Sequence, residues 1–336
     1  MRTRRVGGVL ASLVLMAAVG CSGPSAENAA APAPPPPEAT VAPPPDVTIT
    51  YPVGLRVLHL QRGRGRPLPT LVFYPAVSAV GETAAVGLRT TKHGRRTHYE
   101  LGWPQSPPAR GRFPLVLFSH GLSGSADRYA DALAAWAAAG FVVAAPTFPY
   151  TSEFTDDFWR PDIVNQPADA RFVLARVQRL NYTVGDPLRH RIDTDHMAAI
   201  GHSAGGYTTT GLFTAGHDPR LRAGIIMAGW AARGAFAGPP ATMLFLQGKA
   251  DPIVRVASSQ ALYSRVPWPK SYVLMRRDSH ATYLKPGDIG YDFMNALVVD
   301  FLRWTLEGDE AAHRRLPPTE YPPLGLRSGL TLAIPD

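Results

Sequence analysis

The run MAAIGHSAGGYTTTGLF, residues 197–213, constrains the fold of this chain more than any other stretch. An apolar segment leads into Ser203, which has Gly201 and Gly205 two residues away on either side, and a helical pattern follows. A serine on such a strand–turn–helix needs very small neighbours because the chain passes close to itself. We therefore predict that Ser203 is a nucleophile at a sharp turn, rather than a serine in a chance small-residue loop.

Short apolar runs alternate with helical patterns along the body of the chain. We expect strands at residues 55–60, 70–74, 115–119, 141–145, 197–200, 223–227, 242–246 and 271–275. We expect helices at residues 127–139, 168–180, 205–213, 257–264 and 291–306. Apolar strands separated by helices indicate a parallel sheet covered on both faces. The predicted fold class is α/β, with a mostly parallel, doubly wound sheet.

A serine hydroxyl needs a neighbouring base, and in such a sheet the acid and the histidine follow the serine along the chain. His280 comes just after the last predicted strand, and therefore at the sheet edge expected for Ser203. His217 lies in a loop before a strand, and His313 follows the final helix. We predict His280 as the base, and we interpret His202, beside the serine, as a packing residue.

Asp251 is the predicted acid of this site. It follows the strand at 242–246 in the loop QGKADP, where it would fix the histidine tautomer and stabilise the imidazolium. An aspartate before proline can also simply cap a helix or shape a loop. Asp278 is the alternative acid, but two residues from His280 it is poorly placed to reach the imidazole.

Two backbone N–H groups are predicted to bind the oxyanion of a tetrahedral intermediate. One belongs to Ala204, directly after the serine, and the other to Leu122 in the loop of LVLFSHGLSGS. His120 in that loop is interpreted as a packing and loop-fixing residue. No cluster of His, Cys, Asp or Glu has the spacing of a metal site, and we expect no cofactor.

Aromatic residues follow two of the predicted strands and could line an acyl or aromatic pocket. These are Phe148 and Tyr150 after the strand at 141–145, and Trp230 after the strand at 223–227. Ordinary core or surface packing is an equal alternative for each. The segment 151–165 is interpreted either as a partial lid or as a plain crossover.

The first residues, MRTRRVGGVLASLVLMAAVGCSG, have the pattern of a secretory signal peptide at 1–20. Small residues before Cys21 resemble the bacterial lipoprotein cleavage box, in which the cysteine is acylated and anchors the chain to a membrane. Plain secretion with an incidental cysteine is the alternative. Either interpretation places the protein outside the cytoplasm.

The rest of the chain divides by composition. Residues 21–46 form an Ala/Pro-rich tether, 47–315 a catalytic domain, and 316–336 a proline-rich tail. A single cysteine allows no internal disulfide, so the core must hold the fold. The net charge of +8 falls to +5 without the three signal-peptide arginines, and no basic stripe with aromatics suggests nucleic acid. The oligomeric state is left open.

With these residues in place, the chain resembles the α/β-hydrolase superfamily over most of residues 52–306. The stretches GLRVLHLQRGRGRPLPTLVFYPA and RPDIVNQPADARFVLARV are similar to bacterial dienelactone-hydrolase-like and platelet-activating-factor acetylhydrolase-like proteins. The SHG loop, the GFVVAAP strand and the IGHSAGG turn also resemble actinobacterial polyester hydrolases and cutinases, and chlorophyllases. The resemblance implies hydrolysis of carboxylic esters by Ser203, His280 and Asp251.

Expected substrates are small-molecule, lipid or polymer esters. Dienelactone hydrolases proper use a cysteine nucleophile, whereas this chain has serine, and the disulfide of many polyester hydrolases cannot form here. A serine peptidase or amidase and an acyltransferase use the same residues and remain alternatives. A non-catalytic surface lipoprotein that binds a partner is an alternative of another class.

Overall fold

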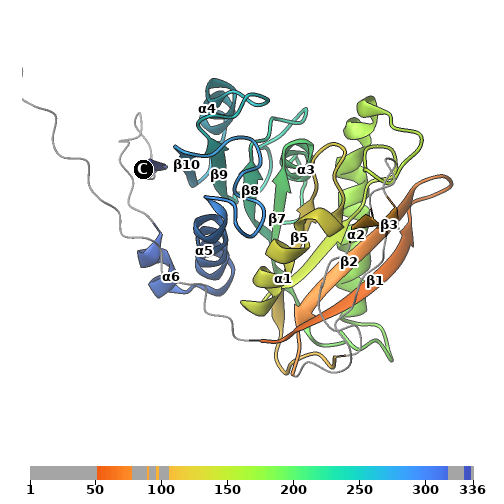
Figure 1. Ribbon diagram of the computed structural model, residues 1–336. Coiled ribbons are helices and arrows are strands. Elements are labelled where there is room, and N and C mark those ends of the chain that lie inside the picture. Colours follow the sequence, from red (N-terminus) through yellow and green to blue (C-terminus); the bar gives the residue numbers. More distant parts are fainter. Residues whose placement is uncertain (1–50, 78–88, 91–95, 98–105, 317–328, 334–336) are drawn as a thin grey trace, which may run out of the picture. The chain divides into compact units, whose positions relative to one another are not determined.

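The computed structural model describes residues 51–77, 89–90, 96–97, 106–316 and 329–333, all of which belong to one unit of the chain, residues 40–336. A nine-stranded sheet runs through this part in the order β1-β2-β6-β5-β7-β8-β9-β10-β11 (Figure 1). The strands are β1 (Val53–Gln61), β2 (Pro67–Pro75), β5 (Phe113–Ser119), β6 (Val142–Pro146), β7 (Ile192–His202), β8 (Leu221–Met227), β9 (Thr242–Gly248), β10 (Lys270–Met275) and β11 (Gly329–Ala333). A separate pair joins β3 (Arg89–Thr90) to β4 (Arg96–Thr97).

Most neighbouring strands run parallel. β1 and β2 form an antiparallel hairpin, β2 is antiparallel to β6, and every other neighbouring pair in the nine-stranded sheet is parallel. The sequences FPLVLFS and VVAAP of β5 and β6 are buried along their whole length, as expected of strands covered on both faces. The mostly parallel, doubly wound sheet predicted from the sequence is confirmed.

Helices cover both faces of the sheet. α1 (Ala130–Ala138) and α5 (Tyr291–Leu302) pack on one apolar layer, through residues such as Trp136 and Leu297. α2 (Gln166–Leu180), α3 (Ala204–Leu212) and α4 (Val256–Ser264) pack on the other, through Val173, Leu212 and Leu262. No helix in the described part of the chain is long and apolar enough to cross a membrane.

Several short elements do not appear in the sequence prediction. These are the 3₁₀ turns η1 (Ala126–Tyr129) and η2 (Arg160–Asn165), the π-helical turn η3 (Arg303–Glu307) and α6 (Glu310–Arg315). The helix expected at 291–306 leaves α-geometry after Leu302. The proline-rich tail contains β11, which pairs in parallel with β10. The predicted signal peptide and tether lie outside the described residues.

Ion pairs join the turn of the β1–β2 hairpin to Asp162 in η2 and Asp169 in α2. Arg66 contacts Asp162 at 2.8 Å and also contacts Asp169, which Arg62 reaches at 2.6 Å. Both aspartates are fully buried, so their charges depend on these arginines. The short basic run that includes Arg62 and Arg66 is therefore occupied by internal contacts.

We expect Arg66→Met to lower the free energy of unfolding by about 3 kcal/mol, because it leaves Asp162 without a cationic partner while keeping most of the apolar stem. Urea unfolding measures this loss. Arg64→Met is the matched control: Arg64 is exposed in the same turn, and its replacement should change stability by no more than about 0.5 kcal/mol. If the two substitutions lowered the free energy of unfolding equally, the ion pairs of Arg66 with the buried aspartates would not be the source of its contribution to stability.

Candidate active site

Ser203 occupies the sharp turn between β7 and α3. β7 ends at His202, α3 begins at Ala204, and Ser203 has φ 56° and ψ −117°, a left-handed conformation that is rare for a residue with a side chain. A Cβ atom on Gly201 would lie 2.0 Å from the carbonyl oxygen of Gly205. The turn therefore requires glycine for space, as the sequence predicted.

The loop after β5 lies directly against this serine. A Cβ atom on Gly121 would lie 3.2 Å from the Cβ atom of Ser203. Leu122 follows Gly121, and Ala204 opens α3, where first-turn N–H groups have no partner within the helix. Within the described part of the chain, neither N–H donates a hydrogen bond. These are the two groups predicted to bind an oxyanion. Ala204 directly follows Ser203, and Leu122 directly follows Gly121, which lies against Ser203.

His280 and Asp251 meet although 29 residues separate them. Nδ1 of His280 lies 2.8 Å from Oδ2 of Asp251. Oδ1 of Asp251 accepts hydrogen bonds from the N–H groups of Ile253 at 2.8 Å and Val254 at 2.9 Å. Burial tends to raise the pKa of Asp251, but the bonds from His280, Val254 and Ile253 outweigh it and lower the pKa below its ordinary value. The carboxylate is thus held ionised beside the imidazole.

Gln247 is a further residue around Asp251 that the sequence did not indicate. Its Nε2 donates to Oδ2 of Asp251 at 3.0 Å and to the carbonyl oxygen of Val254 at 2.9 Å. The alternative acid Asp278 is engaged elsewhere, since its Oδ1 accepts from the Thr282 hydroxyl at 2.9 Å. The structure therefore pairs His280 with Asp251 rather than with Asp278.

His202 does more than fill space. Its Nε2 lies 2.7 Å from the carbonyl oxygen of His280, which can only accept, so Nε2 carries the proton. Nδ1 then accepts from the Tyr129 hydroxyl at 2.9 Å, and that hydroxyl in turn accepts from the N–H of Gly121 at 3.3 Å. A chain of hydrogen bonds thus joins the loop after β5 to the backbone of His280. Only long-range contacts define this chain, so the sequence interpretation of packing missed it.

His120 fixes the same loop from its other side. Its Nδ1 donates to the carbonyl oxygen of Gly121 at 2.7 Å, and its Nε2 accepts from the N–H of Phe148 at 3.0 Å. Burial lowers the pKa of His120 to about 4. Burial, with the nearby His280, lowers the pKa of His202 to about 3. Both imidazoles are therefore neutral near pH 7 and act as hydrogen-bonding groups.

These two histidines make folding sensitive to acid. In the unfolded chain each titrates near 6.5, whereas His120 and His202 stay neutral in the folded chain down to about pH 4 and 3. Their contribution to the free energy of unfolding is complete above pH 6.5. It is lost as the pH falls toward the pKa values of the folded chain, because the unfolded chain takes up protons first. Below pH 6.5 each histidine lowers the free energy of unfolding by about 1.4 kcal/mol per pH unit. For the two together we expect this free energy to fall by about 4 kcal/mol between pH 7 and pH 5.

Urea unfolding at several pH values measures this dependence. In His202→Gln one of the two titrating groups is absent, so the slope of unfolding free energy against pH should fall by about half, whatever the stability at pH 7. An unchanged slope would contradict the assignment of neutral, buried imidazoles.

The predicted pocket residues lie in three different surroundings. Phe148 is fully buried and its ring packs on His120, 5.0 Å between centroids, so it presents no surface to a ligand. The Tyr150 hydroxyl donates to the carbonyl oxygen of Gly65 at 2.7 Å, which ties it to the β1–β2 turn. Trp230 is half-buried after β8, with its ring 5.9 Å from that of Tyr207 at the start of α3. Phe148 is therefore a core residue, whereas Trp230 packs beside α3, which begins directly after Ser203.

The segment 151–165, interpreted as a lid or a crossover, is attached to the body at several points. The Thr151 hydroxyl accepts from Nε2 of Gln166 at 2.7 Å, and Asp162 is paired with Arg66. Phe158 and Trp159 are exposed by 41% and 56%. The segment therefore has the features of a crossover. It is attached through Thr151 and Asp162, and the aromatic side chains between these two residues are exposed.

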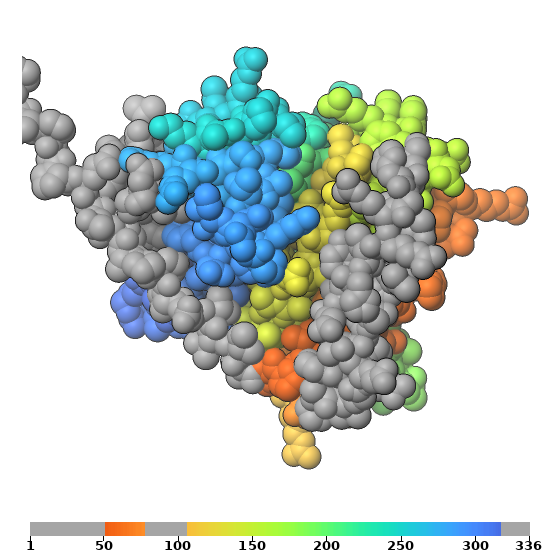
Figure 2. Space-filling model, viewed as in Figure 1, coloured from red at the N-terminus to blue at the C-terminus, as the bar shows by residue number. Residues whose placement is uncertain are grey.

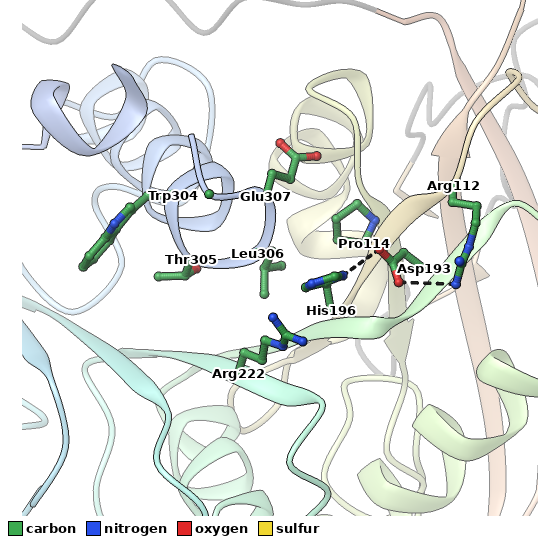
Figure 3. A pocket seen from close by; sticks show the side chains of 10 residues that line it. Arg112, Pro114, Asp193, His196, Arg222, Trp304, Thr305, Leu306 and Glu307 are labelled. Atoms are coloured by element: carbon green, nitrogen blue, oxygen red, sulfur yellow. Dashed lines mark hydrogen bonds and ion pairs between the residues drawn. The ribbon is translucent and has the colours of Figure 1, made fainter. Parts of the chain in front are cut away.

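A cavity of about 390 Å³ lies elsewhere, where β5, β7 and β8 begin (Figure 3). Asp193 accepts from His196 at 2.7 Å and from Arg112 at 3.5 Å in its wall. Ser203 and Asp251 follow the opposite ends of the parallel strands, so this cavity is not part of the candidate site. Within the described ranges, no group of three or more His, Cys, Asp or Glu side chains could hold a metal ion.

The sheet order, the helices on both faces and the serine turn after β7 define an α/β-hydrolase fold. A family model described as PET hydrolase-like matches residues 135–319, more than half of the chain. The chain belongs to this family.

Two further proteins are similar to this chain. NocK of Nocardia uniformis subsp. tsuyamanensis, to which an esterase activity is ascribed, is 32% identical over 267 residues, which cover 75% of this chain and 65% of NocK. The chain thus spans less than two thirds of the length of NocK. The structure of a ferulic acid esterase from Streptomyces cinnamoneus matches with a TM-score of 0.59 at 18% identity, covering 78% of this chain and 91% of that one. The second likeness shows the fold alone.

Proposed function

We propose that this chain hydrolyses carboxylic esters through an acyl-enzyme intermediate on Ser203. The observation that carries the proposal is the pair formed by His280 and Asp251 at 2.8 Å, in a chain of the PET hydrolase-like family whose serine turn is complete. Because Nδ1 of His280 faces Asp251, Nε2 is the nitrogen left to exchange a proton with a serine. The esterase activity ascribed to NocK supports the same chemistry.

In the first half-reaction, Oγ of Ser203 forms a bond to the ester carbonyl carbon while its proton passes to Nε2 of His280. The carbonyl oxygen becomes an oxyanion that accepts hydrogen bonds from the N–H groups of Leu122 and Ala204. The bond from the carbonyl carbon to the alcohol oxygen then breaks. The alcohol leaves with the proton from Nε2, and the acyl group stays on Ser203.

In the second half-reaction, water attacks the acyl carbon and gives a proton to Nε2 of His280. The second oxyanion uses the same two N–H groups, and its collapse returns the proton to Oγ and releases the carboxylic acid. Asp251 keeps the imidazole oriented and stabilises its charge in both halves. It needs no proton of its own, in agreement with the lowered pKa of its carboxyl group.

Two measurements on the wild-type chain test this proposal. A fluorophosphonate, which phosphonylates activated serines, should add one label to the peptide that contains Ser203. p-Nitrophenyl esters of increasing acyl length should be hydrolysed well above background, and p-nitroanilides of the same acids more slowly. No label, or a label on another residue, would contradict the proposal. Faster cleavage of the anilides would make the chain an amidase.

We also propose that the chain is exported and held on a membrane through an acylated Cys21. The support comes from the sequence alone, in the signal-peptide pattern at 1–20 and the Ala/Pro-rich tether at 21–46. Intact-mass measurement of membrane-extracted protein should find a chain that starts at Cys21 and carries lipid. A mature chain that carries no lipid would support export but contradict the membrane anchor. A chain that keeps residues 1–20 would contradict export.

A further inference from the structure

Two neighbouring loops beside the candidate site carry exposed cations. The loop at 249–255 follows β9, and the segment 276–290 follows β10. Lys249, Arg255, Arg277 and Lys285 are all exposed there. None of the four forms an ion pair with another residue in the described part of the chain. Solvated basic side chains of this kind can be neutralised from outside the molecule.

The acidic residues of the same loops do not offset these cations at the surface. Asp251 and Asp278 are buried. Asp288 is half-buried, and its Oδ2 accepts from the backbone N–H groups of Leu284 and Lys285 at 3.1 and 2.9 Å. The exposed charge of the two loops is therefore positive.

Each loop also exposes an isoleucine among these cations. Ile253 is 68% exposed and Ile289 is 65% exposed. Exposed aliphatic side chains are common singly, but here both occur on the loops that carry the basic residues.

The two loops are neighbours in space. The N–H of Ala250 donates to the carbonyl oxygen of Asp278 at 2.9 Å, and His280 meets Asp251 across the same boundary. Figure 2 shows the cyan and light-blue segments around these loops adjoining at the surface. We call this surface the basic rim, and define it as Lys249, Ile253, Arg255, Arg277, Lys285 and Ile289.

We propose that the basic rim docks on an anionic lipid bilayer. The four cations complement anionic headgroups, each strengthening binding by about fivefold near such a surface. The two isoleucines fit the boundary between headgroups and acyl chains, which takes up aliphatic side chains. A polyanion without a hydrocarbon layer, such as a sulfated polysaccharide, would leave both isoleucines in water. The combination of charge and aliphatic tips therefore favours a lipid surface.

Docking by the rim brings the candidate site to the lipid surface, because Asp251 and His280 belong to the same two loops. Esters presented at an anionic bilayer are then the substrate class that the rim selects. This last step rests on the proposed ester hydrolysis, whereas the docking itself does not.

Co-sedimentation with vesicles tests the docking. The mature chain, residues 21–336, carries Ser203→Ala and Cys21→Ser, so that hydrolysis, acylation and the predicted signal peptide do not affect the result. It should bind phosphatidylcholine vesicles that contain phosphatidylglycerol more tightly than phosphatidylcholine alone, and less tightly as salt is raised. Replacing the four rim cations by glutamine should weaken binding to the anionic vesicles by at least about tenfold. Ile253→Ser with Ile289→Ser should weaken it as well.

A matched control replaces four exposed arginines outside the rim by glutamine: Arg179 in the last turn of α2, and Arg110, Arg189 and Arg222, which lie before or at the start of parallel strands. This change of net charge is the same, and binding should fall by less than about twofold. If both variants lost the same amount of vesicle binding, net charge alone would explain the effect, and the proposal would be overturned. Heparin binding lost with the rim cations, together with vesicle binding unaffected by the isoleucines, would identify a polyanion as the partner instead.

Discussion

Ser203→Ala is expected to lower kcat for p-nitrophenyl ester hydrolysis by about 10⁶-fold, because no other group in the site can form the acyl-enzyme. The fold should survive, because the turn depends on the absence of side chains at Gly201 and Gly205, which the substitution leaves unchanged. Steady-state kinetics measures the loss, and urea unfolding checks the stability. Fluorophosphonate labelling should disappear in the same variant.

The matched control is Ser258→Ala, on the exposed surface of α4, which should keep both full kcat and full labelling. If Ser203→Ala retained more than about one thousandth of wild-type kcat, a route without the acyl-enzyme would have to carry the reaction, because oxyanion binding alone leaves only about a millionth of the wild-type rate.

Asp251→Asn is expected to lower kcat by about 10⁴-fold. The carboxylate now accepts from Nδ1 of His280, and an amide nitrogen at the same place would favour the opposite tautomer and present Nε2 with a proton already bound. Oδ1 of the asparagine can keep its bonds to Ile253 and Val254, so the loop should hold its shape. Kinetics on a short-chain p-nitrophenyl ester measures the loss.

Asp278→Asn is the comparison that separates the two candidate acids. Asp278 bonds to Thr282 and not to His280, so its amide variant should lose less than about tenfold in kcat at a temperature where both variants are folded. A larger loss from Asp278→Asn than from Asp251→Asn would exchange their roles.

The sequence predicted the sheet and the serine turn because both depend on local pattern. Strands such as VVAAP and LRAGIIM are short and apolar, and segments with helical periodicity separate them. The turn at Ser203 is indicated by the glycines two residues before and after it. Chain order and loop position were also enough to select Asp251 and His280, which lie 2.8 Å apart.

Contacts between segments that are distant along the chain could not be predicted from the sequence. The hydrogen bonds of His202 with Tyr129 and with the backbone of His280 span 73 and 78 residues. Gln247 shows no pattern that distinguishes it from other strand residues, although it holds Asp251. The antiparallel hairpin β1–β2 and the strand β11 in a proline-rich tail depend on pairing, which local propensity does not specify.

The ion pairs of Arg62 and Arg66 have a consequence for local unfolding. They join the β1–β2 turn to Asp162 in η2 and Asp169 in α2, roughly 100 positions further along the chain. Opening either segment alone would leave buried carboxylates uncompensated, so the two should open together as one cooperative unit. Their slowest-exchanging amide hydrogens should then share one opening free energy, and Arg66→Met should lower it for both segments at once.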